Sequence, residues 1–181
     1  RERGAWLASD ECYAELGWGE WSDKLIPSVL DPRVCGNSHD GVLAVYSLSK
    51  QSNMAGYRAA FAVGEASLIK GLVNLRMHSG LNTPGPVQRA MVVALGDEEH
   101  VRVEKEIYRE RREVLLDAVR AFGFRLAESQ AGLYLWATLG EDCWKTVDRM
   151  ADLGIVVVPG TFYGEHSTEF VRFSITATDD K

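Results

Sequence analysis

Residues Gly41 to Lys50 read GVLAVYSLSK, and this stretch of the 181-residue chain decides its fold. Residues 41–46 are too uniformly apolar for an alternating surface strand, and with their β-branched side chains they are too few for a helix. The stretch therefore predicts a buried strand. Lys50 would follow the end of that strand, which is where open α/β sheets hold their ligands.

An amine, two hydroxyls and a guanidinium lie at or just beyond the end of this predicted strand. A partly desolvated lysine has a lowered pKa, so Lys50 would be a carbonyl nucleophile able to form a Schiff base. Ser47, Ser49 and Arg58 are natural phosphate ligands, through their hydroxyls and the planar guanidinium. A lysine beside phosphate ligands indicates pyridoxal phosphate as cofactor. Taken alone, the stretch fits a solvated turn with a surface lysine equally well.

A second short apolar run, residues 4–9, ends in DECY at positions 10–13. Pyridoxal phosphate needs a carboxylate that keeps its pyridine nitrogen protonated, and it gains from a phenol near its 3-oxygen. We assign Asp10 and Tyr13 to these tasks, because the neighbouring position points Glu11 to another side. Without further context, an Asp-Glu pair after a strand is better explained as a helix N-cap.

Together, DECY at 10–13, SLSK at 47–50 and GYR at 56–58 resemble the class I and II, fold-type I, pyridoxal-phosphate aminotransferases. The similarity extends over essentially the whole chain. It continues through residues 81–88, 132–136, 159–164 and 171–174.

The resemblance implies an α/β fold in two parts. Residues 1–100 would form the C-terminal part of the large cofactor-binding domain, the end of its mixed sheet with helices. Residues 101–181 would form the interdomain helix and a small C-terminal α/β sandwich domain. Ala60 departs from the glycine that many relatives have after the arginine, and a methyl group there puts little in doubt.

The resemblance also implies the roles of individual side chains. Lys50 would be the catalytic residue, and the cofactor-binding residues would be Asp10, Tyr13, Ser47, Ser49, Lys50 and Arg58. In the predicted strand 170–175, Arg172 alternates with apolar residues, a pattern that by itself favours a solvent-facing arginine. By resemblance, Arg172 instead binds the substrate α-carboxylate through two parallel hydrogen bonds.

Four further residues have alternative explanations. Tyr134 and Trp136 would shape the substrate side-chain pocket, although core packing explains at least one of them better. Asn82 and Thr83 would reach the cofactor of the neighbouring subunit in a homodimer, and loop capping explains them equally well.

A narrower similarity concerns GLYLWATLGEDCW at 132–144 and VVPGTFYG at 157–164. These segments resemble the actinobacterial type of N-succinyldiaminopimelate aminotransferase. The implied reaction is transamination of N-succinyl-LL-2,6-diaminopimelate in lysine biosynthesis, with 2-oxoglutarate and glutamate as the other oxo-acid and amino-acid pair. A fold-type I lyase or synthase, or an inactive module that only folds, remains as an alternative.

Family members are much longer than this chain and carry a phosphate loop, a ring-stacking aromatic and an asparagine in their amino-terminal half. Only residues 1–9 precede Asp10. We therefore expect the chain to be the C-terminal half of an enzyme, to be completed by the N-terminal half, and to be inactive alone.

Composition restricts the function class. The net charge of −6 and the acidic residues interleaved with arginines at 109–113 argue against nucleic-acid binding. The sequence shows no membrane-spanning run and no signal peptide, and its three scattered cysteines favour free thiols in a reducing compartment, so we expect a cytoplasmic protein. The histidines lack ligand spacing, so no metal site is expected.

Periodicity and breakers predict the remaining elements. Asp97 should cap a long helix that ends before Gly123. The other predicted helices are 65–78, 87–95 and 141–153, and the other predicted strands are 59–63, 124–128, 133–138, 155–158 and 170–175.

Overall fold

The computed structural model describes residues 3–177, and the chain divides into two compact units. One unit comprises the chain up to Gly17 together with residues 21–105, and the other comprises residues 18–20 and the chain from Glu106 onward. Helices and strands are mixed in both units, in the predicted α/β class. No helix in the described part of the chain is long and apolar enough to cross a membrane.

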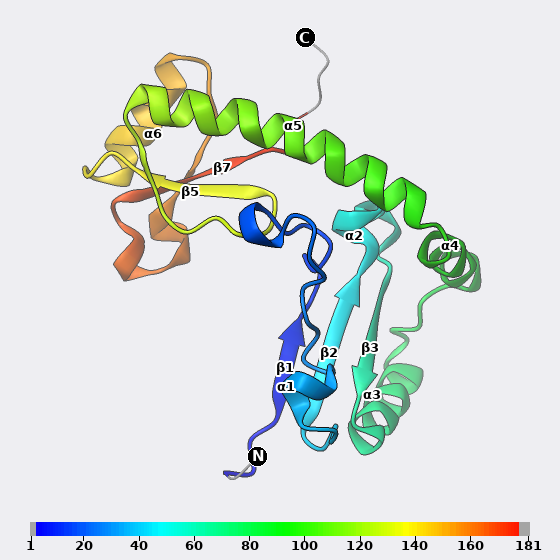
Figure 1. The fold of residues 1–181 in the computed structure, drawn as a ribbon. Helices are drawn as coiled ribbons and strands as arrows, with labels where there is room; N and C mark the ends of the chain where they lie inside the picture. Colours follow the sequence, from blue (N-terminus) through cyan, green and yellow to red (C-terminus); the bar gives the residue numbers. More distant parts are fainter. Residues whose placement is uncertain (1–2, 178–181) are drawn as a thin grey trace. The chain divides into compact units, whose positions relative to one another are not determined.

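The first unit contains a three-stranded sheet in the order β1-β2-β3. Its strands are β1 (Leu7–Asp10), β2 (Val42–Ser47) and β3 (Ala60–Gly64). Strands β1 and β2 run parallel, and β3 is antiparallel to β2, as Figure 1 shows. Because parallel strands end at the same edge of a sheet, residues that follow β1 and β2 lie at that edge.

The predicted strand at residues 41–46 is β2, the middle strand of this sheet. Val42 and Ala44 are buried on one side, and Tyr46 stacks on Phe61 of β3 with ring centroids 5.4 Å apart. The strand passes directly into α2 (Leu48–Gln51). Fully buried Leu48 packs with two residues from elsewhere in the unit, Ala59 and Met91, in a small apolar cluster.

The other elements of this unit are α1 (Pro32–Cys35), η2 (Ala55–Tyr57), α3 (Ala66–Ser79) and α4 (Gly85–Leu95), and η1 (Gly19–Trp21) spans the division between units. Of these, α3 and α4 were predicted and have shifted ends, whereas α1, η1 and η2 were not predicted. Helix α4 begins two residues before the predicted start at Val87. Pro86 lies in its first turn, where a backbone N–H has no hydrogen-bond partner within the helix. The N–H that proline lacks is therefore not missed there.

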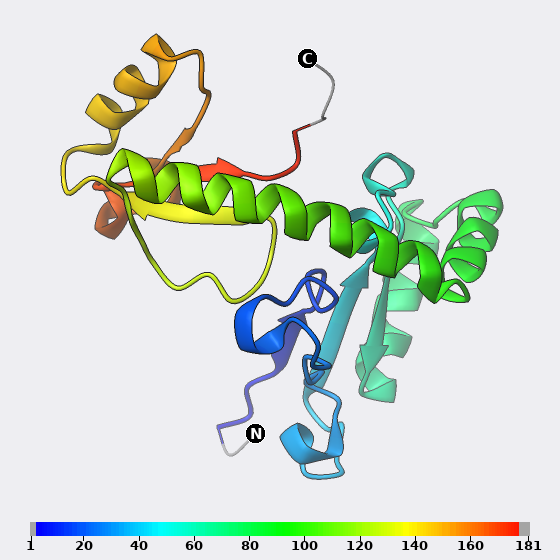
Figure 2. The ribbon, with the colours of Figure 1, turned by 45° about the horizontal axis from the view of Figure 1, so that its top comes forward.

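The long helix predicted near Asp97 is α5 (Glu98–Phe122), which begins in the first unit and ends in the second (Figure 2). Oδ1 of Asp97 accepts hydrogen bonds from the backbone N–H groups of Glu99, at 3.0 Å, and His100, at 3.3 Å. These bonds satisfy donors that have no partner within the first turn, so the predicted cap is confirmed.

The second unit contains a four-stranded antiparallel sheet in the order β4-β5-β7-β6. Its strands are β4 (Arg125–Leu126), β5 (Tyr134–Thr138), β6 (Val158–Pro159) and β7 (Phe170–Ser174), and its shorter helices are α6 (Cys143–Asp152), η3 (Gly160–Tyr163) and η4 (Glu165–Ser167). One face of the sheet packs against α5 and α6. The buried residues of this core are Val119, Phe124, Leu135, Ala137, Cys143, Met150, Val157, Val171 and Phe173.

Two of the predicted strands are shorter in the structure by two or more residues. The strand expected at 155–158 is wrong for its first three residues, since β6 begins at Val158 and Val156 is 94% exposed. The N–H of Ile155 instead bonds to the carbonyl of Met150, so these residues complete the end of α6. The strand expected at 124–128 is reduced to Arg125–Leu126.

Candidate active site

The carboxyl ends of β1 and β2 bring the residues of the DECY and SLSK segments together. Asp10 is the last residue of β1 and pairs in register with Val45 of β2. Nζ of Lys50, in α2, lies 6.0 Å from the ring centroid of Tyr13, in the turn after β1. An amine, a phenol and a carboxylate therefore occupy one edge of the sheet.

The carboxyl group of Asp10 is held in its ionised form. Its Oδ1 accepts a hydrogen bond from the backbone N–H of Cys12 at 3.1 Å. Hydrogen bonds from the Cys12 side chain and backbone lower the pKa of Asp10 below its ordinary value. A carboxylate that favours its ionised form is the group that would keep a pyridine nitrogen protonated.

Glu11, next in sequence, is engaged elsewhere. Its Oε1 accepts hydrogen bonds from the hydroxyl of Ser28 at 3.0 Å and from the backbone N–H of Val29 at 2.7 Å. These contacts attach the loop before α1 to the end of β1. Glu11 therefore has a structural partner, whereas within residues 3–177 the Asp10 carboxylate bonds to its near neighbour Cys12.

The two predicted phosphate-binding serines are neighbours in space. Ser47 is the N-cap of α2, and its Oγ accepts from the N–H of Ser49 at 3.2 Å. The two hydroxyl oxygens are 2.8 Å apart, and Ser47 Oγ also lies 3.2 Å from the carbonyl of Ala59. The hydroxyls thus form one polar cluster one residue before Lys50.

Arg58 lies next to Ala59, whose backbone carbonyl bonds to the turn that contains Ser47 and Leu48. Ala59 accepts the backbone N–H of Leu48 at 3.3 Å in addition to the Ser47 hydroxyl. The backbone of Arg58 is in the left-handed region, with φ of 54°. This conformation is uncommon for residues other than glycine, asparagine or aspartate. Its side chain is exposed, and Nη1 donates to the carbonyl of Ala55 at 3.0 Å.

This set of side chains fits pyridoxal phosphate. Two adjacent hydroxyls and an exposed guanidinium suit a phosphate, and an ionised carboxylate suits the pyridine nitrogen. The lysine amine lies on the same edge of the sheet as both. The fit rests on the chemistry and placement of these groups within the first unit.

Cys12 and Tyr46 belong to the same neighbourhood, although sequence reasoning gave neither a role. Burial first, and then the hydrogen bond to Asp10, raise the pKa of the Cys12 thiol to about 11. Burial also raises the pKa of Tyr46 to about 12, and its hydroxyl bonds to Gln51. The position of Cys12 inside the DECY segment could have indicated that it lies at the site. For Tyr46 the sequence offered no signal beyond its place in the predicted strand.

In the second unit, Arg172 lies between aromatic rings. Its guanidinium carbon is 4.1 Å from the ring centroid of Tyr134 and 5.5 Å from that of Tyr163. The Nε atom of Arg172 is buried and has no hydrogen-bond partner within residues 3–177. A buried guanidinium N–H without a partner is costly, so this atom is available for an anionic ligand.

The loop that contains Asn82 and Thr83 is fixed within its own subunit. Nη2 of Arg76 donates to the carbonyl of Leu81 at 2.5 Å and lies 3.4 Å from the Thr83 hydroxyl. Gln88 donates to the carbonyl of Thr83 at 2.7 Å. These bonds agree with the loop-capping explanation of Thr83, and the contact with a second subunit stays a prediction.

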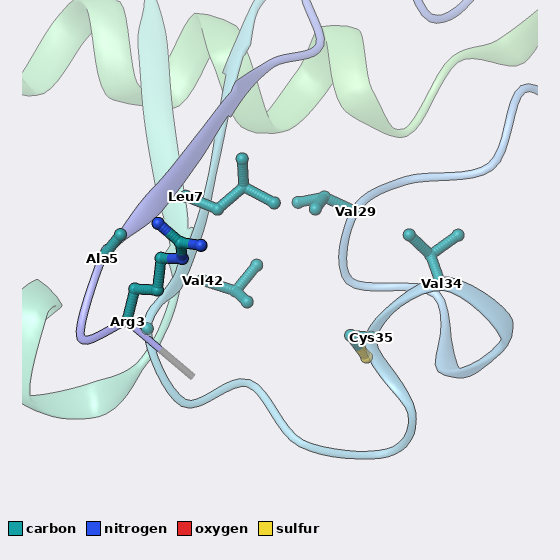
Figure 3. A pocket seen from close by; sticks show the side chains of 8 residues that line it. Arg3, Ala5, Leu7, Val29, Val34, Cys35 and Val42 are labelled. Atoms are coloured by element: carbon teal, nitrogen blue, oxygen red, sulfur yellow. The ribbon is translucent and has the colours of Figure 1, made fainter. Parts of the chain in front are cut away.

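A hollow of about 550 Å³ lies at the opposite edge of the first sheet (Figure 3). Leu7 and Val42, the first residues of β1 and β2, point into it together with Val29. Among the described residues that line it, Arg3 is the only charged one. The hollow is therefore mainly apolar and lies away from the amine and carboxylate at the carboxyl ends of the strands.

Curated proteins with similar sequences are aminotransferases. The chain is 52% identical over its full length to the 4-dedimethylamino-4-oxo-anhydrotetracycline transaminase OxyQ of Streptomyces rimosus, of which it covers 49%. It is 49% identical to the probable aminotransferase Rv1178 of Mycobacterium tuberculosis, of which it covers 42%. It is 33% identical to the LL-diaminopimelate aminotransferase of Aquifex aeolicus, of which it covers 46%. The chain thus spans about half the length of these relatives.

Solved structures show the same fold. An aminotransferase from Neisseria meningitidis is 30% identical with a TM-score of 0.85, over 97% of this chain and 46% of that one. An aminotransferase from Staphylococcus aureus is 27% identical with a TM-score of 0.81, over 96% of this chain and 46% of that one. The family model "Aminotransferase class I and II" matches residues 1–181. This match, together with the lysine, carboxylate and paired hydroxyls at the sheet edge, establishes that the chain belongs to the class I and II aminotransferase family.

Proposed function

We propose that the polypeptide carrying this chain is a pyridoxal-phosphate-dependent aminotransferase that exchanges an amino group between an amino acid and 2-oxoglutarate. The observation that carries the proposal is the placement of Lys50, Tyr13 and ionised Asp10 at one edge of the first sheet. Enzymes of this family depend on pyridoxal phosphate, which agrees with the residues present.

When bound, pyridoxal phosphate supplies an aldehyde that carries the amino group and a ring that accepts electrons from the substrate. Asp10 would hold the proton of the ring nitrogen, because its own pKa is lowered. Ser47, Ser49 and Arg58 would bind the phosphate through two hydroxyls and a guanidinium. Tyr13 would lie near the 3-oxygen.

Lys50 would carry the chemical step. A lysine amine that is partly buried can bind a carbonyl carbon covalently and, once released, can act as a base. It would then take the proton from the substrate α-carbon as a base and, as an acid, deliver it to the C4′ carbon of the cofactor. Arg172 would hold the substrate by its α-carboxylate, using the Nε atom that has no partner among the described residues.

The substrate pair is the finer part of the proposal. We infer N-succinyl-LL-2,6-diaminopimelate as amino donor, with 2-oxoglutarate as acceptor, in lysine biosynthesis. The similarity to proteins named LL-diaminopimelate aminotransferase, at 33% and 30% identity, supports a diaminopimelate-type substrate. The 52% identity to OxyQ favours a second candidate, the oxo group of an anhydrotetracycline precursor.

The setting of the site is also proposed. Resemblance to the family supports a cytoplasmic homodimer, with Asn82 and Thr83 near the partner's cofactor. It also supports residues 1–100 as part of the large cofactor-binding domain and residues 101–181 as the interdomain helix and small domain. Activity would need a polypeptide that also contains the part of the relatives that this chain does not cover.

The test uses that longer polypeptide with pyridoxal phosphate. Glutamate should be converted to 2-oxoglutarate in an amount equal to the cofactor when no acceptor is present. Supplying N-succinyl-LL-2,6-diaminopimelate together with 2-oxoglutarate, or the oxo compound of the second candidate together with glutamate, identifies the partner of the exchange. A product formed by elimination or condensation would replace the proposal by a fold-type I lyase or synthase, and the absence of any cofactor change would leave a folded module.

A further inference from the structure

One face of the second sheet carries a continuous set of aromatic rings. Successive residues of a strand point to opposite faces, so Tyr134 and Trp136 of β5 share a face, as do Phe170 and Arg172 of β7. Trp136 is the register partner of Arg172. The opposite face holds the buried core residues Leu135 and Val171, among others.

The ring of Tyr163 is brought onto this face by the short helix η3. Gly160, at the start of η3, approaches the backbone so closely that a Cβ atom would lie 1.9 Å from the carbonyl oxygen of Ser167. It would also lie 2.6 Å from the carbonyl oxygen of Phe170. Glycine therefore lets η3 pack against the start of β7.

Tyr163 is then fixed by further aromatic contacts. Its ring meets Trp136 edge to face, with centroids 5.3 Å apart and planes at 90°. Trp136 in turn stacks on Phe170, with centroids 5.5 Å apart and planes at 5°. Such contacts restrict rotation of the rings, so Tyr163 holds one orientation next to the Arg172 guanidinium.

The guanidinium is attracted to both tyrosine rings. A cation within about 6 Å of an aromatic centroid is attracted by the negative ring face, and arginine adds planar stacking. The distances of 4.1 Å to Tyr134 and 5.5 Å to Tyr163 both fall in this range. A guanidinium that stacks face-on against a ring keeps the N–H groups on its edge for an acceptor.

We propose that Tyr163 and Tyr134 are positioning residues that hold the guanidinium plane of Arg172, so that its unpartnered Nε edge is presented ready-oriented to the substrate carboxylate. This inference rests on the proposed role of Arg172. It adds a source of specificity for the carboxylate group, because an arginine already held in place loses less freedom when the substrate binds.

The test compares Tyr163→Met and Tyr163→Phe in the longer holoenzyme. Methionine keeps an apolar side chain of similar length without a ring face, whereas phenylalanine keeps the ring. The substrates are glutamate and its 1-amide, in which a neutral carboxamide replaces the α-carboxylate. The ratio of kcat/KM for the two compounds measures recognition of the carboxylate charge.

Tyr163→Met should raise KM for glutamate roughly 3- to 30-fold, with kcat little changed and a lower ratio of glutamate to amide. Tyr163→Phe should retain the wild-type ratio. Phe162→Met is the matched control, because Phe162 lies in the same short helix but packs on Trp144, with centroids 5.9 Å apart. This control should also retain the ratio.

Two outcomes separate the inference from the function on which it rests. If Arg172→Ala lowers the ratio and Tyr163→Met does not, the positioning role of Tyr163 is overturned while the carboxylate role of Arg172 stands. If Arg172→Ala leaves the ratio unchanged, the carboxylate role itself fails, and the positioning inference with it. For Tyr134→Met the same ratio is measured, and an unchanged ratio would overturn the positioning role of Tyr134. This variant replaces Tyr163→Met if that one does not fold.

Discussion

Lys50 owes its position to its immediate neighbours. Ser47 ends β2 and caps α2, so the chain turns at once from strand to helix and places the lysine three residues beyond the strand. Leu48, fully buried between them, anchors the turn in an apolar cluster. The backbone of Lys50 is thereby held at a defined point, from which its side chain extends.

Lys50→Ala should abolish turnover of the longer holoenzyme and leave its folding intact. The reason is that no other amine at the carboxyl ends of β1 and β2 is predicted to bind the cofactor aldehyde. Steady-state transamination and thermal unfolding measure the two effects, with Lys70→Ala on the exposed face of α3 as control. Borohydride reduction and peptide mapping should locate the pyridoxyl group on Lys50; a label elsewhere would refute the assignment.

Arg172→Ala should weaken binding of the amino acid more than it affects cofactor retention. Loss of one partner of a desolvated ion pair costs about 2–5 kcal/mol, so KM should rise by at least about 30-fold. Kinetics with glutamate and cofactor content after dialysis are the measurements. Arg149→Ala, which removes an exposed arginine of α6, is the control and should leave KM unchanged.

The Cys12 thiol should react slowly with iodoacetamide in the folded protein. Its pKa is raised to about 11, first by burial and then by Asp10. At pH 8 roughly one thiol in a thousand is then ionised, and the thiolate is the reactive form. Peptide mass spectrometry at several pH values measures the rate, and Asp10→Asn should accelerate it. An apparent pKa near 9 in the wild type would contradict this expectation.

At the scale of elements, the long helix was the easiest to predict and the short strands the hardest. Helix α5 has a cap, a periodic apolar stripe and a terminating glycine, all of them local signals. Strands β4 and β6 contain two residues each, and their length depends on which residues of β5 and β7 they pair with. No local pattern reports such pairing, which explains the overlong strands predicted there.

Helix α6 offers a test of local stability. Oδ1 of its N-cap Asp142 accepts from the N–H of Trp144 at 3.0 Å, so Asp142→Ala should destabilise the protein by about 1 kcal/mol. Urea unfolding followed by fluorescence measures the change. Asp148→Ala removes the same charge from the middle of the same helix and should change stability by less than about 0.5 kcal/mol. Equal effects would show that charge, not capping, matters.

For the whole molecule, the chain spans about half the length of its curated relatives, 49% of one and 42% of another. We expect residues 1–181 alone to bind pyridoxal phosphate weakly or not at all, because cofactor contacts that the family places elsewhere are not supplied. Titration of this chain beside the longer polypeptide, followed by absorbance and equilibrium dialysis, measures the difference. Equally tight binding by both would contradict the prediction.

The sequence by itself determined three local features: a lysine shortly after an apolar strand, a carboxylate at the end of a second strand, and a cap at the start of the long helix. These follow from local patterns, because polarity alternation and capping act within a few residues. Only the tertiary structure decided which side chains meet. The parallel pairing of β1 with β2 brings Tyr13 to Lys50, and the close approach allowed by Gly160 brings Tyr163 to Arg172. Contacts between segments distant in sequence depend on strand register and packing, which no single segment contains.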